Sequence, residues 1–451
     1  MASSRSSTRA DPVERAVAAW LATPLASHGT VAFALSGGRD SMALLHAGAR
    51  ALRERGRDAV AFHVHHGLQA GADAWAAHCG RECVSRGIEY AERRVSVPLI
   101  PRASLEASAR DARYAALREL ARERGVTTIA LAHHQDDQAE TLLLQLGRGA
   151  GPAGLAAMPA EHVDADGLAW CRPLLGVTRA AIAAYAEAHA LRHVDDPSND
   201  DKRWRRNAVR SDIAAAWRAV MPGYPATIAR AAGHQADAAA LLDALAERDA
   251  QDADYDAAAG SFAAATLVAL DDARARNLMR WFLRRHGLPP PSSARLRAMV
   301  DQLAHARDDA AIAIAHAGAI VGRHRGRVAV HAPAPPDYAA PWHGEAAVQL
   351  PHGELRFETV EGRGVDFVRI GAGLEIRPRR GGERLQLAGD RTRRALKSIL
   401  RESSLPTWER DALPLVVAGE TLVAVPGIGV DVAWQAGPGR TGRLPVWRAR
   451  P

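Results

Sequence analysis

The sequence predicts an α/β protein in which a domain with a doubly wound parallel sheet is followed by a helical middle domain and a small α/β C-terminal domain. Residues 30–150 alternate short apolar runs with helical patterns, as in consecutive βαβ units. Residues 226–315 are rich in alanine and have helical periodicity, whereas alternating segments separated by turns follow residue 370. These observations together define the predicted fold class.

The predicted domains are separated by segments rich in turn-forming residues. Residues 221–225, Met-Pro-Gly-Tyr-Pro, interrupt the helical pattern. Residues 333–336, Pro-Ala-Pro-Pro, are typical of a linker because consecutive prolines stiffen a chain. We therefore expect domains at residues 1–222, 223–335 and 370–451.

The elements of the first domain follow from the period of its apolar residues. We expect strands at residues 30–35, 58–65, 88–97 and 126–132, and helices at residues 41–55, 72–87, 104–125 and 136–146. In such a sheet, ligands bind beyond the carboxyl ends of the strands. Residues that directly follow a strand are therefore the first candidates for a functional site.

The composition is that of a globular protein of 451 residues with a net charge of +7. The basic surplus favours a polyanionic partner, although a compositional bias of the genome is an equally good explanation. Three cysteines, Cys79, Cys83 and Cys171, fit neither a disulfide framework nor a zinc site, so we expect packed thiols in a cytoplasmic protein. No stretch approaches the roughly 20 apolar residues of a membrane helix. Monomer and homodimer both remain open.

The strongest motif lies between the first predicted strand and the helix after it. It consists of Ser36, Gly37, Gly38, Arg39, Asp40 and Ser41. Paired glycines let the backbone curl so that N–H groups point at an anion, and serine hydroxyls add donors. Without the lysine of a Walker A loop, the segment is expected to hold the leaving pyrophosphate of ATP, with Asp40 as the Mg²⁺ ligand. The alternative is an ordinary glycine-rich turn.

A second cluster follows the fourth predicted strand. Asp136, Asp137 and Glu140 open a helix and lie three or four residues apart, so at least one acidic pair shares a face. Such carboxylates can hold a metal, bind an ammonium group or accept a proton, whereas the alternative is helix capping. The histidine pairs at residues 65–66 and 133–134 lack cysteine partners and are interpreted as hydrogen-bonding residues, with a catalytic contact of His133 left open.

Two basic segments are candidates for RNA contacts. Residues 202–210 provide Arg203, Arg206, Asn207 and Arg210 around Trp204, which is equally suited to a core position. Residues 374–403 contain nine basic and four acidic residues, which predicts an RNA-binding surface, with a merely solvated face as the alternative. We select three residues of this second segment as contacts, namely Arg379, Arg380 and Lys397.

The motif at residues 36–41 resembles the SGGxDS PP-loop of the N-type ATP pyrophosphatases, which implies an adenine nucleotide α-hydrolase-like fold. Further stretches are similar to the tRNA(Ile)-lysidine synthetases in order and spacing. They are HVHHGL at 63–68, SLEASAR at 104–110 with Arg113 and Tyr114, AHHQDDQAE at 132–140, RGAGPAGL at 148–155, RPLL at 172–175, DDPSN at 195–199, RN at 206–207 with Arg210, RNLMRW at 276–281, RPRRGGER at 377–384, LKSIL at 396–400 and VPGIG at 425–429.

The resemblance implies a ligase that uses ATP and Mg²⁺ to join L-lysine to the wobble cytidine of tRNA(Ile) with a CAU anticodon. The cytidine is adenylated first, with release of diphosphate, and lysine then displaces AMP to give lysidine. The modification changes codon reading from AUG to AUA and charging from methionine to isoleucine. A protonated lysine amine needs a base before it can attack, and Asp137 and Glu140 are both candidates.

A cationic group near the α-phosphate is also expected. Arg110 and Arg113 lie three residues apart on one helix, and Arg113 is the one selected to stabilise charge during the attack, with a solvated surface arginine as the alternative. The predicted catalytic residues are therefore Asp40, Arg113, Asp137 and Glu140, with Asp136 and His133 as substrate contacts.

Related functions fit the sequence less well. A tRNA thiolase needs sulfur-handling cysteines and a queuosine-precursor synthase a cysteine-rich zinc site, and the chain contains no CxxC motif. A glutamine amidotransferase needs a cysteine nucleophile in a context that none of the three cysteines has. A tRNA-binding module without activity has no use for a complete loop and acidic cluster.

Overall fold

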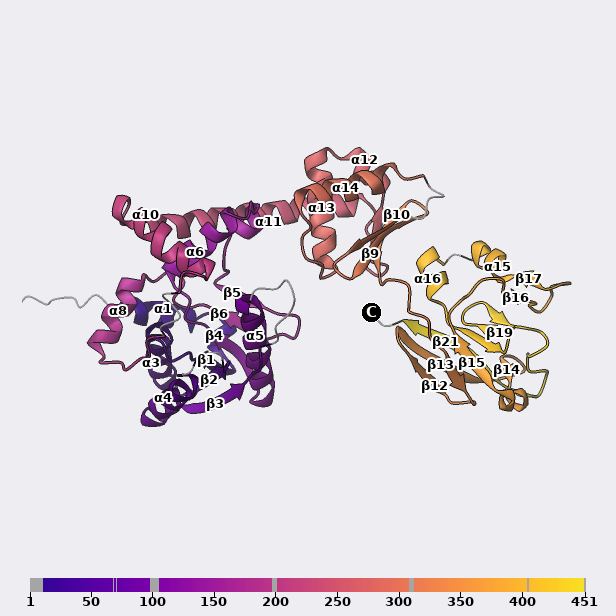
Figure 1. Cartoon of the computed structure of the whole chain (residues 1–451), viewed down its shortest axis with the longest axis horizontal. Coiled ribbons are helices and arrows are strands. Elements are labelled where there is room, and N and C mark those ends of the chain that lie inside the picture. Colours follow the sequence, from indigo (N-terminus) through magenta and orange to yellow (C-terminus); the bar gives the residue numbers. More distant parts are fainter. Residues whose placement is uncertain are drawn as a thin grey trace, which may run out of the picture. The chain divides into compact units, whose positions relative to one another are not determined.

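The computed structural model describes residues 11–67, 69, 71–97, 105–196, 201–307, 312–403 and 405–449. Parts of three similar stretches, Leu68, Ser104 and residues 197–199, lie outside these residues. The chain forms two compact units, Met1–Leu241 and Leu242–Pro451 (Figure 1). No helix of the described parts is long and apolar enough to cross a membrane.

The first unit contains a six-stranded sheet in the order β3-β2-β1-β4-β6-β5. Five strands are parallel, namely β1 (Thr30–Ala34), β2 (Ala59–His65), β3 (Glu89–Arg94), β4 (Val126–Ala130) and β6 (Ala169–Cys171). The edge strand β5 (Glu161–Val163) is antiparallel to β6. The doubly wound parallel sheet is confirmed, whereas β5 and β6 were not predicted.

Helices cover both faces of this sheet. Val31 and Phe33 of β1 pack with one group of helices, while the intervening Ala32 packs with α5 on the other face. The helices α1 (Pro12–Trp20), α2 (Pro24–Ser27), α3 (Arg39–Arg53), α4 (Ala72–Ser85) and α8 (Arg179–Ala188) pack on one face, and α5 (Leu105–Glu123) packs on the other. The first unit also contains α6 (Gln135–Leu146), α7 (Pro152–Leu155), α9 (Arg205–Ala208), the π-helical η2 (Val209–Ile213), α10 (Ala214–Val220) and the larger part of α11 (Tyr224–Asp252). Strands buried on both faces explain the continuous apolar runs.

The second unit begins with the last turns of α11 and continues with a helical layer on a small sheet. The helices are α12 (Ala265–Ala269), α13 (Asp272–Arg285) and α14 (Ser293–His305). The antiparallel sheet has the order β7-β10-β9-β8, formed by β7 (Ser261–Ala263), β8 (Ile312–His316), β9 (Ala319–His324) and β10 (Arg327–His331). The helices of the middle region match the expectation, but the sheet is an addition to it.

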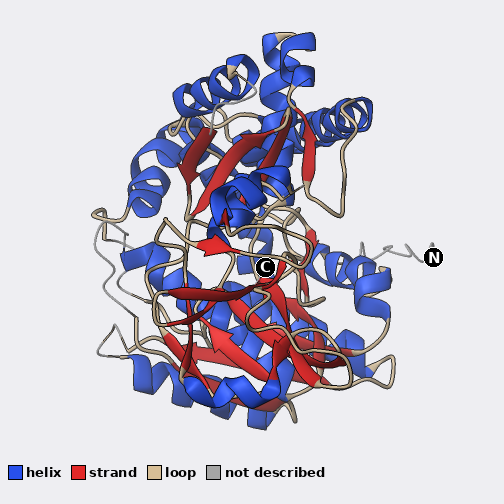
Figure 2. Cartoon of the chain, turned by 90° about the vertical axis from the view of Figure 1, so that its right-hand side faces the viewer, coloured by secondary structure: helices blue, strands red, loops and turns tan. Residues whose placement is uncertain are grey.

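The remaining chain is mostly antiparallel strand. Figure 2 draws the strands of the whole chain in red and the helices in blue. One sheet has the order β11-β15-β18-β19-β20, with β11 (Ala340–Trp342), β15 (Leu374–Arg377), β18 (Leu415–Ala418), β19 (Thr421–Val425) and β20 (Gly429–Val430); another has the order β12-β13-β21-β14, with β12 (Ala347–Leu350), β13 (Gly353–Glu361), β21 (Thr441–Ala449) and β14 (Val365–Asp366). A short pair, β16 (Arg384–Leu385) and β17 (Arg394–Ala395), and the helices η3 (Phe367–Ala372), α15 (Leu396–Glu402) and α16 (Thr407–Ala412) complete it. Because β13 pairs with β21 along its whole length, these sheets begin before residue 370.

Candidate active site

The loop between β1 and α3 has the curled form that the glycines predict. Gly37 has a φ of +86°, and Gly38 is the N-cap of α3 without a side-chain cap hydrogen bond. The Ser41 hydroxyl donates to the Gly38 carbonyl oxygen at 2.9 Å and lies 3.1 Å from the Ser36 hydroxyl, which fixes the turn. The first N–H groups of α3 therefore stay available for an anion, as expected of a phosphate loop.

The acidic helix α6 begins beside this loop, because β1 and β4 are neighbours and both carboxyl ends meet at one edge of the sheet. His134 is the N-cap of α6: its backbone N–H donates to Asp137 Oδ2 at 3.0 Å, and its Nδ1 accepts from the Asp137 N–H at 3.4 Å. Its Nε2 lies 3.5 Å from both Asp40 Oδ2 and Asp137 Oδ2. One histidine thus joins the loop to the acidic helix.

These contacts decide the charges of the three groups. Burial raises the pKa of Asp40, but the hydrogen bond and charge of His134 outweigh it and leave the pKa below its ordinary value. Burial also raises the pKa of Asp137, and His134 and Arg206 again reverse the effect. In turn, burial lowers the pKa of His134, but the two carboxylates prevail and raise it. Both carboxylates are therefore ionised around neutral pH.

Two arginines from α9 and η2 occupy the acidic cluster. Arg206 donates from Nη2 to Asp137 Oδ1 at 2.8 Å and from Nε to Glu140 Oε2 at 3.0 Å. Arg210 binds Glu140 with two hydrogen bonds, at 2.7 and 3.0 Å. Sequence analysis assigned these arginines to RNA and the carboxylates to the reaction, and the structure brings all four side chains together. Arg210 lies on a π-helical turn, a feature often found at functional sites.

Asp136 faces a different set of partners. Its Oδ2 accepts from the backbone N–H of Arg179 at the start of α8, at 3.1 Å, and its Oδ1 accepts from Arg218 at 2.9 Å. Asp136 is 7% exposed, so both carboxylate oxygens lie in the protein interior. In this arrangement the side chain ties α6 to α8 and α10.

Two titratable side chains near the cluster, His133 and Arg113, have few partners. The Nδ1 atom of His133 is buried without a hydrogen bond. Burial lowers the pKa of His133 to about 3; the charge of Asp137 opposes this, and Arg172, Arg206 and Arg113 add to it. Burial likewise lowers the pKa of Arg113, which is half-buried. His133 is thus a neutral imidazole in a positively charged environment.

The other predicted tRNA contacts lie on the segment before α10 and in the C-terminal region. Arg203 pairs with Asp201, and Asn207 donates to the Asp201 carbonyl oxygen at 3.0 Å. Arg379 pairs with Asp411 at 3.1 Å, and Arg380 lies 3.7 Å from Asp337. Lys397 is exposed and forms no ion pair within the described part of the chain.

Some residues of the site were missed or underrated by sequence reasoning. Arg218 gave no signal, because a single arginine in a helical stretch is common on surfaces. Arg172 directly follows β6, which is only three residues long and was not predicted. His134 was interpreted as a hydrogen-bonding residue, but its position between Asp40 and Asp137 depends on two neighbouring strands.

The donor set fits Mg²⁺ through a single carboxylate. No group of three or more His, Cys, Asp or Glu side chains among the described residues could hold a metal. Asp40 Oδ1, however, is buried without a hydrogen-bond partner, beside the free N–H groups of the loop. Since Mg²⁺ is often bound by one carboxylate together with substrate phosphates, Asp40 matches this requirement.

The sheet, the phosphate loop and the adjoining acidic helix define a class, the PP-loop ATPases. Residues 10–216 match the family model of the PP-loop domain, which implies ATP binding. Residues 262–329 match the TilS substrate binding domain, and residues 374–447 match the TilS substrate C-terminal domain.

Similar full-length proteins identify the family within this class. The chain is 44% identical over 418 residues to a protein of Ralstonia nicotianae, covering 89% of both chains, and 41% identical over 459 residues to one of Burkholderia pseudomallei, covering 93% of both. A protein of Aromatoleum aromaticum is 36% identical over 431 residues, with 95% of this chain and 99% of that one covered. All three are named tRNA(Ile)-lysidine synthase. The chain belongs to the tRNA(Ile)-lysidine synthase family of enzymes.

Proposed function

We propose that this protein joins L-lysine to C2 of the wobble cytidine in the CAU anticodon of tRNA(Ile), using ATP, to form lysidine. The observation that carries the proposal is the contact between the phosphate loop and the acidic helix through His134, which lies 3.5 Å from Asp40 and from Asp137. A nucleotide-activating loop and groups that handle an amine therefore share one site. A tRNA substrate places the reaction in the cytoplasm.

The first step is activation of the cytidine. The free N–H groups at the start of α3 and the hydroxyls of Ser36 and Ser41 would hold the phosphates that leave as diphosphate. Asp40 would hold Mg²⁺ through Oδ1, which accepts no hydrogen bond although Arg39 Nε lies 3.6 Å away, and the ion would neutralise phosphate charge. The C2 carbonyl oxygen of the cytidine attacks the α-phosphate, with Arg113 stabilising the charge that develops.

The second step is transfer of lysine. Its ε-ammonium, with a pKa of about 10.4, must lose a proton before the nitrogen attacks C2 and AMP leaves with the former carbonyl oxygen. Asp137 is the better placed acceptor, because His134 joins it to Asp40 at the loop. Glu140 accepts three hydrogen bonds from Arg206 and Arg210, whereas Asp137 accepts one from Arg206 and one from the His134 backbone N–H, so Glu140 is assigned to positioning the arginines. The substrate ammonium must compete with Arg206 for the Asp137 carboxylate.

The tRNA contacts extend beyond the reacting nucleotide. Arg203 and Asn207 flank the acidic cluster on the segment before α10 and are proposed to contact the RNA. The C-terminal region, residues 370–451, is proposed to bind the tRNA through Arg379, Arg380 and Lys397, of which Lys397 is exposed and without an ion pair in the described residues. Phosphate contacts of this kind position a nucleic acid without reading its sequence.

The test is incorporation of labelled lysine by the purified full-length protein, with ATP and an unmodified tRNA bearing CAU. Elongator methionine tRNA serves as the specificity control. Changing both Asp137→Asn and Glu140→Gln should retain ATP binding and abolish lysine transfer. Wild-type protein that binds ATP and tRNA but incorporates no lysine would contradict the proposal. Full lysine transfer by the double variant would show that neither Asp137 nor Glu140 is needed for the second step.

A further inference from the structure

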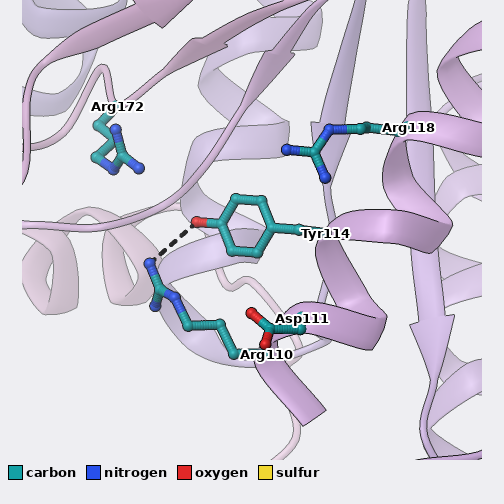
Figure 3. A pocket seen from close by; sticks show the side chains of 5 residues that line it. All are labelled: Arg110, Asp111, Tyr114, Arg118 and Arg172. Atoms are coloured by element: carbon teal, nitrogen blue, oxygen red, sulfur yellow. Dashed lines mark hydrogen bonds between the residues drawn. The ribbon is translucent and has the colours of Figure 1, made fainter. Parts of the chain in front are cut away.

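A hollow of about 450 Å³ opens on the first unit, beside the candidate active site. Its lining comprises Arg110, Asp111, Tyr114 and Arg118 of α5, and Arg172, which follows β6 (Figure 3). Figure 3 shows the Tyr114 side chain between Arg118 and Arg110, with its hydroxyl on the side where Arg172 lies. Three guanidinium groups thus surround one aromatic ring.

The lining has a surplus of positive charge, because its three arginines share it with a single carboxylate, Asp111. Arg172 is only 8% exposed, yet the one hydrogen bond of its side chain within the described residues runs from Nη1 to the Pro159 carbonyl oxygen at 2.8 Å, and its Nε is buried without a partner. Arg110 donates to the Tyr114 hydroxyl at 3.3 Å and has no ion pair within the described chain. Only Arg118 is neutralised, by Asp164 at 2.9 Å.

A buried guanidinium without an anion is costly, because its positive charge has lost water and gained nothing equivalent. In the acidic cluster, by contrast, Arg206 and Arg210 are both paired with carboxylates. The buried, unmatched guanidinium of Arg172 therefore indicates an anionic ligand, and the exposed Arg110 adds a second positive charge to the same lining. Arginine suits a phosphate in particular, since its planar fork gives two parallel hydrogen bonds.

The other side chains of the hollow favour a nucleotide unit over a free anion. The Tyr114 ring is held against Trp170, with ring centroids 4.8 Å apart, and Arg110 lies 5.1 Å from the Tyr114 ring centroid. Aromatic rings and guanidinium planes are the surfaces on which unpaired RNA bases stack. The exposed Asp111 carboxylate would repel a free phosphate, but it can accept a hydrogen bond from a ribose 2′-hydroxyl.

The hollow adjoins the site where the cytidine reacts. Arg172 follows β6, and β6 pairs with β4, the strand that leads to His133 and His134. Arg113, the neighbour of Tyr114 on α5, and Arg172 both act on His133, since their charges help to depress its pKa. An RNA strand whose reacting base lies at the phosphate loop, residues 36–41, would therefore pass close to this hollow.

We propose that this hollow binds a phosphodiester of the tRNA next to the reacting nucleotide, with Arg110 and Arg172 as ligands of its oxygens and Tyr114 as a surface for the adjoining ribose or base. This inference rests on the proposed function for the identity of the RNA. The phosphates of ATP are assigned to the loop at residues 36–41, which leaves the hollow for the other polyanion of the reaction.

The experiment measures binding of the unmodified CAU tRNA to the full-length protein without ATP or lysine, over a range of salt concentrations. The variants are Arg110→Gln, Arg172→Gln and Arg172→Lys, with Arg122→Gln as the matched control, because Arg122 is an exposed arginine of the same helix outside the hollow. Thermal unfolding identifies variants that do not fold; exposed Arg110 keeps the test valid if Arg172→Gln is one of them.

Removal of one charge-assisted phosphate interaction should raise the Kd for tRNA roughly tenfold in Arg110→Gln and Arg172→Gln. The slope of log K against log salt should fall by about 0.7 for each phosphate that is no longer neutralised. Arg172→Lys should retain the slope, and Arg122→Gln should match the wild type in both quantities. In the complete reaction the same two glutamine variants should raise the KM for tRNA and leave the KM for ATP unchanged.

Unchanged tRNA affinity and salt slope in folded Arg110→Gln would overturn the proposal. The proposal would also fail if the variants raised only the KM for ATP. It would fail too if Arg172→Gln lost binding of inorganic phosphate but kept the wild-type affinity for tRNA. A protein whose tRNA binding depends on the hollow but which incorporates no lysine would contradict the proposed function and leave this site standing.

Discussion

The pairing of Glu140 with two arginines makes a quantitative prediction for Glu140→Gln. The Glu140 side chain is 4% exposed and accepts hydrogen bonds of 2.7, 3.0 and 3.0 Å. Breaking a buried ion pair costs about 3–5 kcal/mol because the remaining charge is left uncompensated. The side chains of Arg206 and Arg210 are 23% and 27% exposed, and Arg206 retains its ion pair with Asp137 in the variant. We therefore expect the free energy of unfolding to fall by about 3 kcal/mol, the lower end of this range.

The assay is thermal unfolding of the full-length protein, followed in the transition of the first unit. For a unit of this size, about 3 kcal/mol corresponds to a decrease in Tm of roughly 6–12 °C. A double-mutant cycle with Arg210→Gln isolates the pair: the double variant should be more stable than the sum of the single effects predicts, by about 1–3 kcal/mol. Additive effects, or a Glu140→Gln protein that melts with the wild type, would refute the reasoning.

Three further predictions concern the loop and a neighbouring helix pair. Gly37→Ala places a side chain at a φ of +86° and 3.0 Å from Cys79 Sγ, so it should lower the free energy of unfolding by about 1–2 kcal/mol and weaken ATP binding; calorimetry of both quantities checks this. Asp40→Asn should reduce the apparent Mg²⁺ affinity of ATP-dependent lysine transfer at least roughly tenfold, which a magnesium titration of the activity measures. Burial, with the charge of His189 adding to it, lowers the pKa of His46 from 6.5 to about 4, so its stabilising contribution is present above pH 6.5 and is lost as the pH falls toward 4. Urea unfolding across this range should show a steeper loss of stability for wild type than for His46→Gln, and equal slopes would contradict the assignment.

The sequence predicted the parallel sheet well because its signals are local. Strands buried on both faces are continuous apolar runs, and the helices between them have a clear period, so β1 to β4 and α3 to α6 lie within a few residues of their predicted positions. The glycine turn at Gly37 and Gly38 is likewise local, since a positive φ and a close approach to Cys79 require a residue without a side chain. The phosphate loop follows β1 and the acidic helix follows β4, so the two lie side by side once β1 and β4 are neighbours in one parallel sheet.

The missed elements are short or only weakly alternating. β5 and β6 have three residues each, too few for a periodic pattern, and their pairing with each other and with β4 is long-range. The strands β8 and β10 alternate Ile or Val with alanine over only a few positions, and because alanine also suits a helix, they resemble the alanine-rich helical stretch before them. Their hairpin turns at Gly318 and Gly326, both with positive φ, were the available signal.

The pairing in the candidate site could not be predicted residue by residue. Glu140 and Arg210 are 70 positions apart, and each alone fits several roles: an acid at a helix start is a common cap, and an arginine beside a tryptophan is a common RNA contact. Only the packing of α9 and η2 against α6 decides that these groups neutralise one another. Sequence therefore indicated the right chemical groups and left their partners open.

Two sets of arginines near one sheet edge have opposite consequences for the substrates. Arg206 and Arg210 are matched by Asp137 and Glu140, so the acidic cluster has little net charge, and a lysine ammonium must take over hydrogen bonds that guanidinium groups already make. Such an exchange costs less than burying a new charge, and it favours a ligand that resembles an arginine side chain in length and charge. Arg110 and Arg172 form no ion pair within the described residues, so their counter-charge in the hollow is left to the ligand. If both inferences hold, raised salt should weaken tRNA binding much more than lysine binding, because only the tRNA adds net charge compensation to the site.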